Sequence, residues 1–324
     1  MATIHDVANA AGVSTATVSR VLNGSNLVSS KKKKLVMDAI TSTGYIVPER
    51  VVRTTTSAKK LIILIGSLYH PPICNNFQKE IIDLGYQVLF CYYDNPQYLS
   101  SIRNTLQLLK NQIAGIMLLN TPDDSRELQE LLADYPLVQI GSSIYADAPN
   151  YTIGSDEVSV SRTAMDYLIE QGCRKTAVIS FDSKSSILMA RNNNRVNGCL
   201  LSQLNHRMSV DYSLIKYVDA TFEGGYDGIR DLLVEHPDID SVVCTLDSIG
   251  VGCNYYLNQE GLRSRIRMII ADSSETWDLH KLGIPFINNH QESIGASAAR
   301  ILHAVIVGEL STPFQQYIPF ELDC

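Results

Sequence analysis

The chain has 324 residues, of which 45% are hydrophobic and 19% are charged, and its formal net charge is −7. This length suits a small module joined to a large one, or two domains of moderate size, with ample apolar material for a core. We expect neither a signal peptide nor a membrane span, because the N-terminus lacks a basic-then-apolar segment and the longest uncharged stretch, 61–78, is interrupted by His, Pro and Asn.

Two short helices are predicted at the N-terminus. Thr3 can cap the first, with Asp6 three residues later, and the apolar positions of this helix form one face: Ile4, Val7, Ala8 and Ala11. Gly12 supplies the positive φ that ends the helix, and Ser14 caps a second helix whose inward residues are Val18, Val21 and Leu22. The pattern indicates a helix-turn-helix; an ordinary helical hairpin with a solvated outer face is the alternative.

The outward face of the second helix carries short hydroxyls, one methyl, one guanidinium and one amide: Thr15, Ala16, Thr17, Ser19, Arg20 and Asn23. Such groups hydrogen-bond phosphates, contact thymine methyls and reach guanine edges in a major groove. The face therefore indicates DNA binding.

A third helix is expected from Ser29 or Ser30 to about Thr43, with a buried face of Leu35, Val36, Ala39 and Ile40. The three helices form a predicted headpiece, residues 1–44. Residues 1–60 carry nine Lys and Arg against three acids, a net charge of +6, which leaves −13 for the rest. A basic head on an acidic body is expected when only the head meets DNA, although some of the four lysines 31–34 can equally form a solvated helix face.

Residues 3–23 resemble, nearly position for position, the N-terminal signature of the lactose repressor and galactose repressor family of bacterial transcription regulators. The resemblance implies that Thr15, Ala16 and Arg20 contact base edges. It implies phosphate contacts for Ser14, Thr17, Ser19 and Asn23, and Thr3 and Ser29 complete the predicted DNA-binding set.

Residues 45–60 are expected to form a hinge or linker. In the family this stretch ends in a short helix that wedges a leucine into the minor groove. Here the corresponding position falls on Thr54 or Thr55, and Thr54–Thr56 favours neither a helix nor an apolar wedge. We infer a weaker hinge, or one that uses Val51 or Val52.

From residue 61 onward, short apolar runs alternate with helical patterns, which predicts parallel strands covered by helices in a doubly wound α/β architecture. The expected strands are Leu61–Ile65, Val88–Cys91, Ile113–Leu119, Leu137–Ile140, Ala177–Ile179, Ser241–Cys244, Met268–Ala271 and Pro285–Ile287. Ligands bind beyond the carboxyl ends of such strands. The polar residues predicted there are Tyr69, His70, Asn120, Thr121, Ser142, Ser143, Asp182, Asp247 and Asp272, each of which could instead be a turn or cap.

The body, residues 61–324, resembles the effector and dimerisation domain of the same family more loosely. Asp156–Glu157 stands where the family has Asp-Asn, Arg195 opens its Arg-x-x-Gly segment, and Asp247 lies in its Asn-Asp motif with Leu246 replacing the Asn. The resemblance implies a two-lobed, periplasmic-binding-protein-like fold crossed by three strands. Lobe one is expected at about 61–170 and 290–318, and lobe two at about 171–289.

The residues that the resemblance implies for effector contact are Arg195 and Asp247, followed by Asp156 and Asn289. An arginine and a carboxylate that face one crevice could equally form a structural salt bridge.

Catalysis has no support in the sequence, because no nucleophile elbow, metal-binding His pair or phosphate-cradling loop occurs. We expect no cofactor and no metal. The seven cysteines show no Cys-x-x-Cys spacing, and most are predicted to be buried thiols in a reducing compartment.

These features predict a cytoplasmic, homodimeric, sequence-specific repressor of a carbohydrate-utilisation operon, bound to double-stranded operator DNA and, when bound, associated with the nucleoid. A small sugar or sugar phosphate would act as allosteric effector. A regulator that responds to a nucleobase or nucleoside, or to no ligand, is the alternative, and a transport-type solute-binding protein is a further one. The sequence leaves open the identity of the effector, whether the effector releases or tightens operator binding, and the operator sequence.

Overall fold

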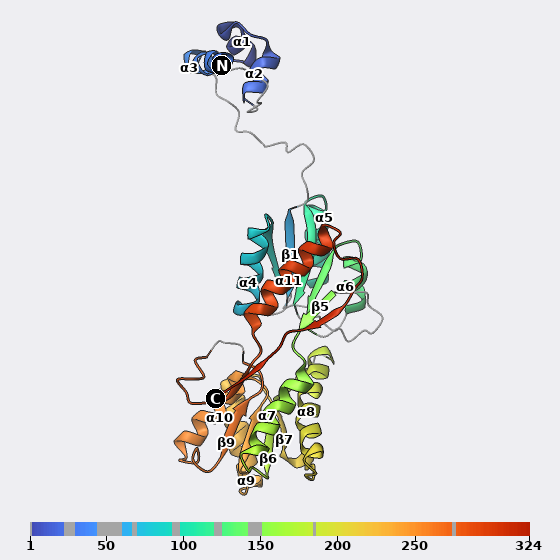
Figure 1. The fold of residues 1–324 in the computed structure, drawn as a ribbon, viewed down its shortest axis with the longest axis vertical. Coiled ribbons are helices and arrows are strands. Elements are labelled where there is room, and N and C mark those ends of the chain that lie inside the picture. Colours follow the sequence, from blue (N-terminus) through green and yellow to red (C-terminus); the bar gives the residue numbers. More distant parts are fainter. Residues whose placement is uncertain are drawn as a thin grey trace. The chain divides into compact units, whose positions relative to one another are not determined.

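The computed structural model describes residues 2–22, 30–43, 60–66, 70–92, 98–119, 125–141, 151–183, 186–273 and 277–324 (Figure 1). The chain separates into two compact units, Met1–Ser57 and Ala58–Cys324, which are described separately. The predicted linker, 45–60, lies outside the described residues except for Lys60, so the expectations for Val51, Val52 and Thr54–Thr56 fall there.

The described residues of the first unit form three helices, α1 (Ile4–Ala11), α2 (Thr15–Leu22) and α3 (Ser30–Thr43). The predicted capping box is present, since Asp6 N donates to Thr3 Oγ1 at 3.4 Å and Thr3 N donates to Asp6 Oδ2 at 2.7 Å. Gly12 ends α1 with φ 62°. Thr17 N donates to Ser14 Oγ at 3.2 Å, which caps α2 as expected.

One apolar core joins these helices. Its buried residues are Val7, Ala8, Ala11, Val18, Val36 and Ala39, with Ile4, Val13, Val21 and Ile40 packed against them. Leu35, predicted to be buried, is instead 45% exposed. Val36, Ala39 and Ile40 form the inward stripe of α3, and Leu35 lies at the edge of that stripe, about 100° around the helix from Val36.

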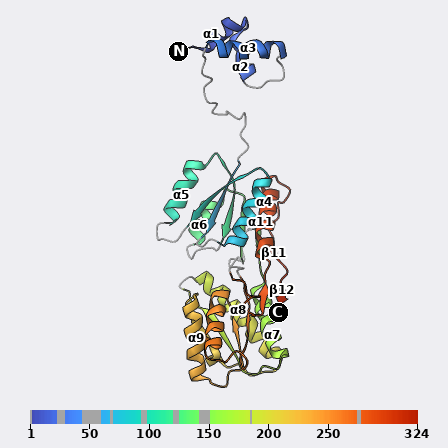
Figure 2. The same cartoon turned by 90° about the vertical axis from the view of Figure 1, so that its left-hand side faces the viewer.

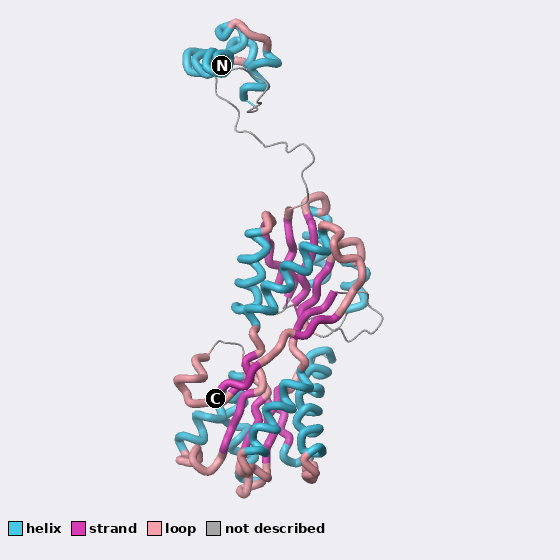
Figure 3. Tube along the Cα trace, in the orientation of Figure 1, coloured by secondary structure: helices cyan, strands magenta, loops and turns pink. Residues whose placement is uncertain are grey.

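The described residues of the second unit form two six-stranded sheets, each the centre of one lobe (Figures 2 and 3). Sheet one has the order β11-β5-β4-β3-β1-β2 and all its pairs are parallel. Its strands are β1 (Leu61–Gly66), β2 (Gln87–Tyr92), β3 (Ile113–Leu119), β4 (Leu137–Ile140), β5 (Tyr151–Gly154) and β11 (Gln315–Tyr317).

Sheet two has the order β12-β10-β9-β8-β6-β7 and is parallel except for β12, which pairs antiparallel with β10. Its strands are β6 (Thr176–Phe181), β7 (Ile215–Val218), β8 (Ser241–Cys244), β9 (Arg267–Ile270), β10 (Phe286–Asn288) and β12 (Glu321–Asp323). The eight predicted strands are all present.

Helices cover both faces of each sheet, as a doubly wound fold requires. In lobe one, α4 (Pro71–Asp83) and α11 (Gln291–Ile306) bury one face, and α5 (Tyr98–Leu109) and α6 (Ser125–Leu132) bury the other. In lobe two, α7 (Glu157–Glu170) and α8 (Ser186–Asn205) cover one face, and α9 (Phe222–Glu235) and α10 (Asp247–Gln259) cover the other, with the short 3₁₀ helix η1 (Tyr212–Leu214). Each sheet therefore has an apolar core on both of its faces, which explains why its strands are uninterrupted apolar runs in the sequence.

The chain passes between the lobes three times among the described residues, at 155–156, 289–290 and 318–320. The expected boundary at 170 is therefore misplaced, because α7 follows the first passage and packs with α8 on sheet two. Its buried residues, such as Ala164 and Leu168, contact the lobe two core. The segment after 318 also belongs to lobe two through β12.

The seven cysteines are all free thiols, as expected from their spacing. Five are buried, Cys91 is half-buried and Cys324 is exposed. No described helix is long and apolar enough to cross a membrane.

Candidate functional site

A cleft lies where the strands of both sheets end. The space among its lining residues measures about 460 Å³, part of it open to solvent. Lobe one contributes mostly apolar groups and lobe two contributes charged ones. The lining residues are His70, Ile73, Leu119, Ile140, Gly141, Gly154, Ser155, Glu157, Arg191, Asp272, Gln291 and Ile294.

Glu157, the first residue of α7, is the centre of the polar side of the cleft. Its Oε1 accepts hydrogen bonds from Arg191 Nε at 3.0 Å and Arg191 Nη2 at 2.5 Å, and its Oε2 accepts one from Arg195 Nε at 2.6 Å. Burial raises the pKa of this carboxyl, but the charges of Arg191 and Arg195 outweigh burial and lower the pKa to about 2. Glu157 is therefore ionised throughout the physiological pH range.

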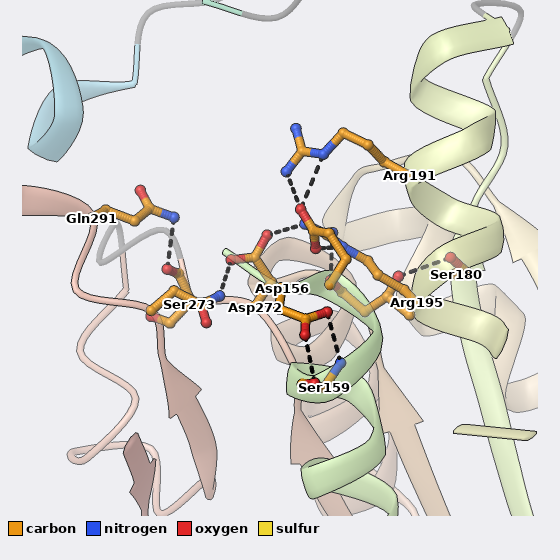
Figure 4. A network of polar contacts seen from close by, with 11 residues as sticks. Asp156, Ser159, Ser180, Arg191, Arg195, Asp272, Ser273 and Gln291 are labelled. Carbon is orange, nitrogen blue, oxygen red and sulfur yellow. Dashed lines mark hydrogen bonds and ion pairs between the residues drawn. The ribbon is translucent and has the colours of Figure 1, made fainter. Parts of the chain in front are cut away.

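Arg195 lies one turn after Arg191 on α8 and is almost fully buried. Besides Glu157, it donates through Nη1 to the backbone oxygen of Thr245 at 2.9 Å and through Nη2 to Asp272 Oδ2. Burial disfavours its charge, but Asp272 and Glu157 raise the pKa of the guanidinium above its ordinary value. Figure 4 shows the two arginines and Asp272 joined in one network. Arg195 thus links α7, α8 and the ends of two strands.

Asp272 and two buried amides form the opposite side of this network. Asn289 Nδ2 donates to Asp272 Oδ1 at 2.7 Å, and Gln291 Nε2 donates to the backbone oxygen of Ser273 at 2.9 Å (Figure 4). Among the described residues, no hydrogen-bond partner remains for Asn289 Oδ1 or Gln291 Oε1, and both oxygens are buried. An unsatisfied buried acceptor is costly, so Gln291 Oε1, whose residue lines the cleft, is a candidate for contact with a ligand that donates hydrogen bonds.

His70 caps α4 on the lobe one side of the cleft. Burial lowers the pKa of its imidazole, while Asp272 and Asp247 raise it and Arg191 and Arg195 lower it. Because burial is the largest of these effects, His70 is neutral at neutral pH and can both donate and accept a hydrogen bond.

The four residues predicted for effector contact surround the cleft rather than line it. Arg195 and Asn289 belong to the polar network, one contact behind the lining carboxylates. Asp156 caps α7 and accepts hydrogen bonds from Ser159 N and Oγ at 3.1 and 2.6 Å. Asp247 is buried at the start of α10 and acts electrostatically on His70.

The strand-end pattern had indicated two of the lining residues, His70 and Asp272. Of the other strand-end candidates, Asp182 is exposed and outside the lining, and Tyr69, Asn120, Thr121, Ser142 and Ser143 lie outside the described residues. Sequence reasoning missed Glu157 and Arg191 as partners. The available signal was the spacing of Arg191 and Arg195, which are four residues apart on one helix face.

Two of the predicted DNA-contacting residues, Thr15 and Thr17, lie on α2, while Ser14 caps α2 and Thr3 caps α1. Thr3 and Ser14 are exposed, and Thr15 and Thr17 are half-buried. The backbone of α2 carries Ala16, Ser19 and Arg20, whose side chains lie outside the described set, as do Asn23 and Ser29 entirely. Among the residues that the structure describes, no group of three His, Cys, Asp or Glu could hold a metal ion.

Two family descriptions match the chain and decide its relationship. Residues 3–47 match "Bacterial regulatory proteins, lacI family", and residues 69–307 match "Periplasmic binding proteins and sugar binding domain of LacI family". The chain belongs to the LacI family. This LacI-family protein is a DNA-binding transcription regulator and not an enzyme, as the sequence predicted.

Known relatives align with almost the whole LacI-family chain. The HTH-type transcriptional regulator CelR of Thermobifida fusca is 28% identical over 96% of this chain and 94% of its own length. The HTH-type transcriptional repressor PurR of Histophilus somni strain 129Pt is 25% identical over 93% of this chain and 91% of its own length.

Two solved structures share the fold over the full chain. A CelR–cellobiose complex has a TM-score of 0.72, 25% identity, and coverage of 100% of this chain and 99% of its own. The lac repressor dimer bound to operator and an anti-inducer has a TM-score of 0.75 and 20% identity, with coverage of 99% and 97%. The expected headpiece and two-lobed periplasmic-binding-protein-like fold are thus confirmed.

Proposed function

We propose that this regulator is a homodimeric repressor of a carbohydrate-utilisation operon and that a small sugar or sugar phosphate in the interlobe cleft controls its binding to operator DNA. The observation that supports an effector role most directly is the cleft itself. It joins side chains of both lobes, Gln291 and His70 from one and Glu157, Arg191 and Asp272 from the other. A ligand there contacts both lobes at once and so favours one arrangement of them.

The comparisons support the sugar class, since the relative CelR was solved with cellobiose. They also support a dimer, because the lac repressor structure is a dimer on its operator. Two headpieces would then enter successive major grooves, about 34 to 36 Å apart. Coupling of roughly 1 to 3 kcal/mol between the effector and operator sites is typical of such linkage. The protein would act in the cytoplasm, where its DNA lies.

The proposed DNA-binding set is Thr3, Ser14, Thr15, Ala16, Thr17, Ser19, Arg20, Asn23 and Ser29. Selection of bound sites from a random duplex pool would yield an operator, and fluorescence anisotropy would then compare that operator with random DNA at two salt concentrations. Phosphate contacts predict a steep salt dependence. Arg20→Ala is expected to abolish discrimination between operator and random DNA, whereas Arg126→Ala, an exposed arginine of the body, preserves it. Unchanged discrimination in Arg20→Ala would refute the recognition-helix assignment.

The proposed effector set is Asp156, Arg195, Asp247 and Asn289. Asp247→Ala is expected to keep operator binding and lose the response of that binding to the effector. A retained response would remove Asp247 from the set, and sedimentation of the apo protein as a monomer at operator-binding concentrations would reject the homodimer.

A further inference from the structure

We propose that the effector is an uncharged, hydroxyl-rich molecule and that the cleft rejects phosphorylated sugars. This inference rests on the proposed function of the cleft and narrows it to one ligand class. Four features of the described residues support it: the pairing of the arginines, the local charge, the starts of the helices around the cleft, and the unpartnered buried acceptors.

The two arginines of the cleft are already engaged by carboxylates. Arg191 donates twice to Glu157, and each nitrogen of the Arg195 guanidinium donates to a protein oxygen, on Glu157, Thr245 or Asp272. Tight phosphate sites use arginines that are open for bidentate contact. A phosphate here would have to displace a buried carboxylate, and would leave that carboxylate uncompensated.

The local charge also opposes an anion. Among the described residues, three carboxylates lie near the cleft, those of Glu157, Asp272 and Asp247, against the two guanidinium groups of Arg191 and Arg195. The neutral state of His70 adds no positive charge. An incoming phosphate would therefore meet a net negative environment in a partly desolvated space, where charge repulsion is stronger than in water.

Three helices that supply lining residues begin at the cleft, and each has a feature in its first turn that disfavours a bound anion. Helix α4 begins with Pro71 and Pro72, which lack N–H groups. Helix α7 is capped by Asp156, which accepts from Ser159 N. Helix α11 has Glu292 in its first turn. Anions bind helix N-termini through free backbone donors and the positive end of the dipole. Here the prolines remove two donors of α4, Asp156 occupies one donor of α7, and Glu157 and Glu292 place negative charge in the first turns of α7 and α11.

The unpartnered acceptors require a donor. Within the part of the chain that the structure describes, Gln291 Oε1 and Asn289 Oδ1 are buried and unpaired, and Gln291 lines the cleft with Asn289 behind it. A fully ionised phosphate has acceptors only, whereas a sugar hydroxyl donates and accepts. The apolar side of the cleft, formed by Ile73, Leu119, Ile140 and Ile294, suits the C–H faces of a sugar ring. An uncharged polyol can therefore donate hydrogen bonds to the polar side of the cleft and pack its C–H groups against the apolar side.

The test is isothermal titration calorimetry of the full chain with matched pairs: glucose and glucose 6-phosphate, trehalose and trehalose 6-phosphate, and sucrose and sucrose 6-phosphate, with cellobiose and inorganic phosphate as further probes. We expect at least one neutral sugar to bind. In the three matched pairs, the phosphate ester should bind at least about tenfold more weakly than its neutral sugar. Inorganic phosphate should not compete. Tighter binding of a phosphorylated member would overturn the inference but leave the sugar-effector function intact, whereas no binding of any probe would overturn both.

Two variants separate the causes. Glu157→Gln releases Arg191 and Arg195 from their shared carboxylate. It should raise the ratio of phosphate-ester affinity to neutral-sugar affinity by at least about threefold. Glu170→Gln, at the exposed end of α7, should leave that ratio unchanged. Gln291→Leu keeps every charge and should weaken neutral sugar binding roughly threefold to tenfold. An unchanged ratio of ester affinity to neutral-sugar affinity in Glu157→Gln would contradict the inference. If Glu157→Gln folds poorly, Gln291→Leu decides, and an unchanged affinity for the neutral sugar in that variant would contradict the inference.

Discussion

Replacement of Glu157 by Gln removes one buried negative charge and keeps the shape of the side chain. The side chains of Glu157 and Arg195 are 6% and 3% exposed, and their closest atoms are 2.6 Å apart. The variant therefore leaves the Arg195 charge buried with only Asp272 as its carboxylate partner. We expect a clear loss of stability at neutral pH.

The magnitude follows from the pKa of Glu157. The difference between the ordinary value of 4.5 and the folded value of about 2 corresponds to roughly 3 kcal/mol at about 1.36 kcal/mol per pKa unit. Breaking a buried ion pair costs about 3 to 5 kcal/mol, which agrees with this figure. At about 2 °C per kcal/mol for a body of this size, the variant should unfold roughly 6 °C below the parent protein at pH 7.

The loss depends on pH in a definite direction. The folded-state pKa is depressed, so this stabilisation is complete above about pH 4.5 and is lost as the pH falls toward 2. At pH 3 the parent has lost roughly 2 kcal/mol of it, and the difference between parent and variant should shrink to less than half of its value at pH 7. The lowered pKa of His70 affects both proteins alike and cancels from the comparison.

Thermal unfolding followed by circular dichroism at pH 7, 5, 4 and 3 measures this difference. Glu170→Gln is the matched control, because it makes the same chemical change at an exposed position of α7. The reasoning is refuted if Glu157→Gln unfolds within about 2 °C of the parent at pH 7, or if the gap remains constant down to pH 3.

Three further predictions concern packing and reactivity. Gly12→Ala forces a β-carbon into φ 62°, so we expect about 1 kcal/mol less local stability and amide exchange in α1 roughly fivefold faster by hydrogen-exchange mass spectrometry; unchanged exchange would contradict this. In Gly295→Ala the new β-carbon would lie 2.1 Å from the backbone oxygen of Ile73. This clash should lower the free energy of unfolding, measured by urea titration, by about 1 to 3 kcal/mol. The neighbouring Ser297→Ala should change that free energy by no more than about 0.5 kcal/mol. In the native protein Ellman's reagent should modify exposed Cys324 rapidly and not Cys199, where burial raises the pKa of the thiol to about 12; a fast phase that survives Cys324→Ser would refute the assignment.

The sequence predicted the elements whose information is local. Strands such as β3, in which all seven residues are buried, leave an uninterrupted apolar run that is visible in the chain. The capping box of Thr3 and the left-handed Gly12 also depend on neighbouring residues only. Strands β11 (Gln315–Tyr317) and β12 (Glu321–Asp323) are short, and all but one of their residues are exposed, so they carry no apolar signal.

The site was less accessible because its chemistry depends on distant pairs. Arg195 could be assigned from its motif, but its partners Glu157 and Asp272 lie 38 and 77 residues away. The lobe that carries α7 was also mistaken, since chain order does not show on which sheet a helix packs. Only the observed packing of Ala164 and Leu168 reveals it.

The last strands of the chain complete both sheets, and this has a consequence for biosynthesis. Helix α11 and β11 belong to lobe one, whose first strand is β1, and β12 closes the edge of sheet two. A ribosome must therefore release the chain through β11 and β12 before both lobes can reach their final packing. Until then, β5 and β10 present unpaired edges, so the nascent chain passes through a stage in which chaperones have an obvious target.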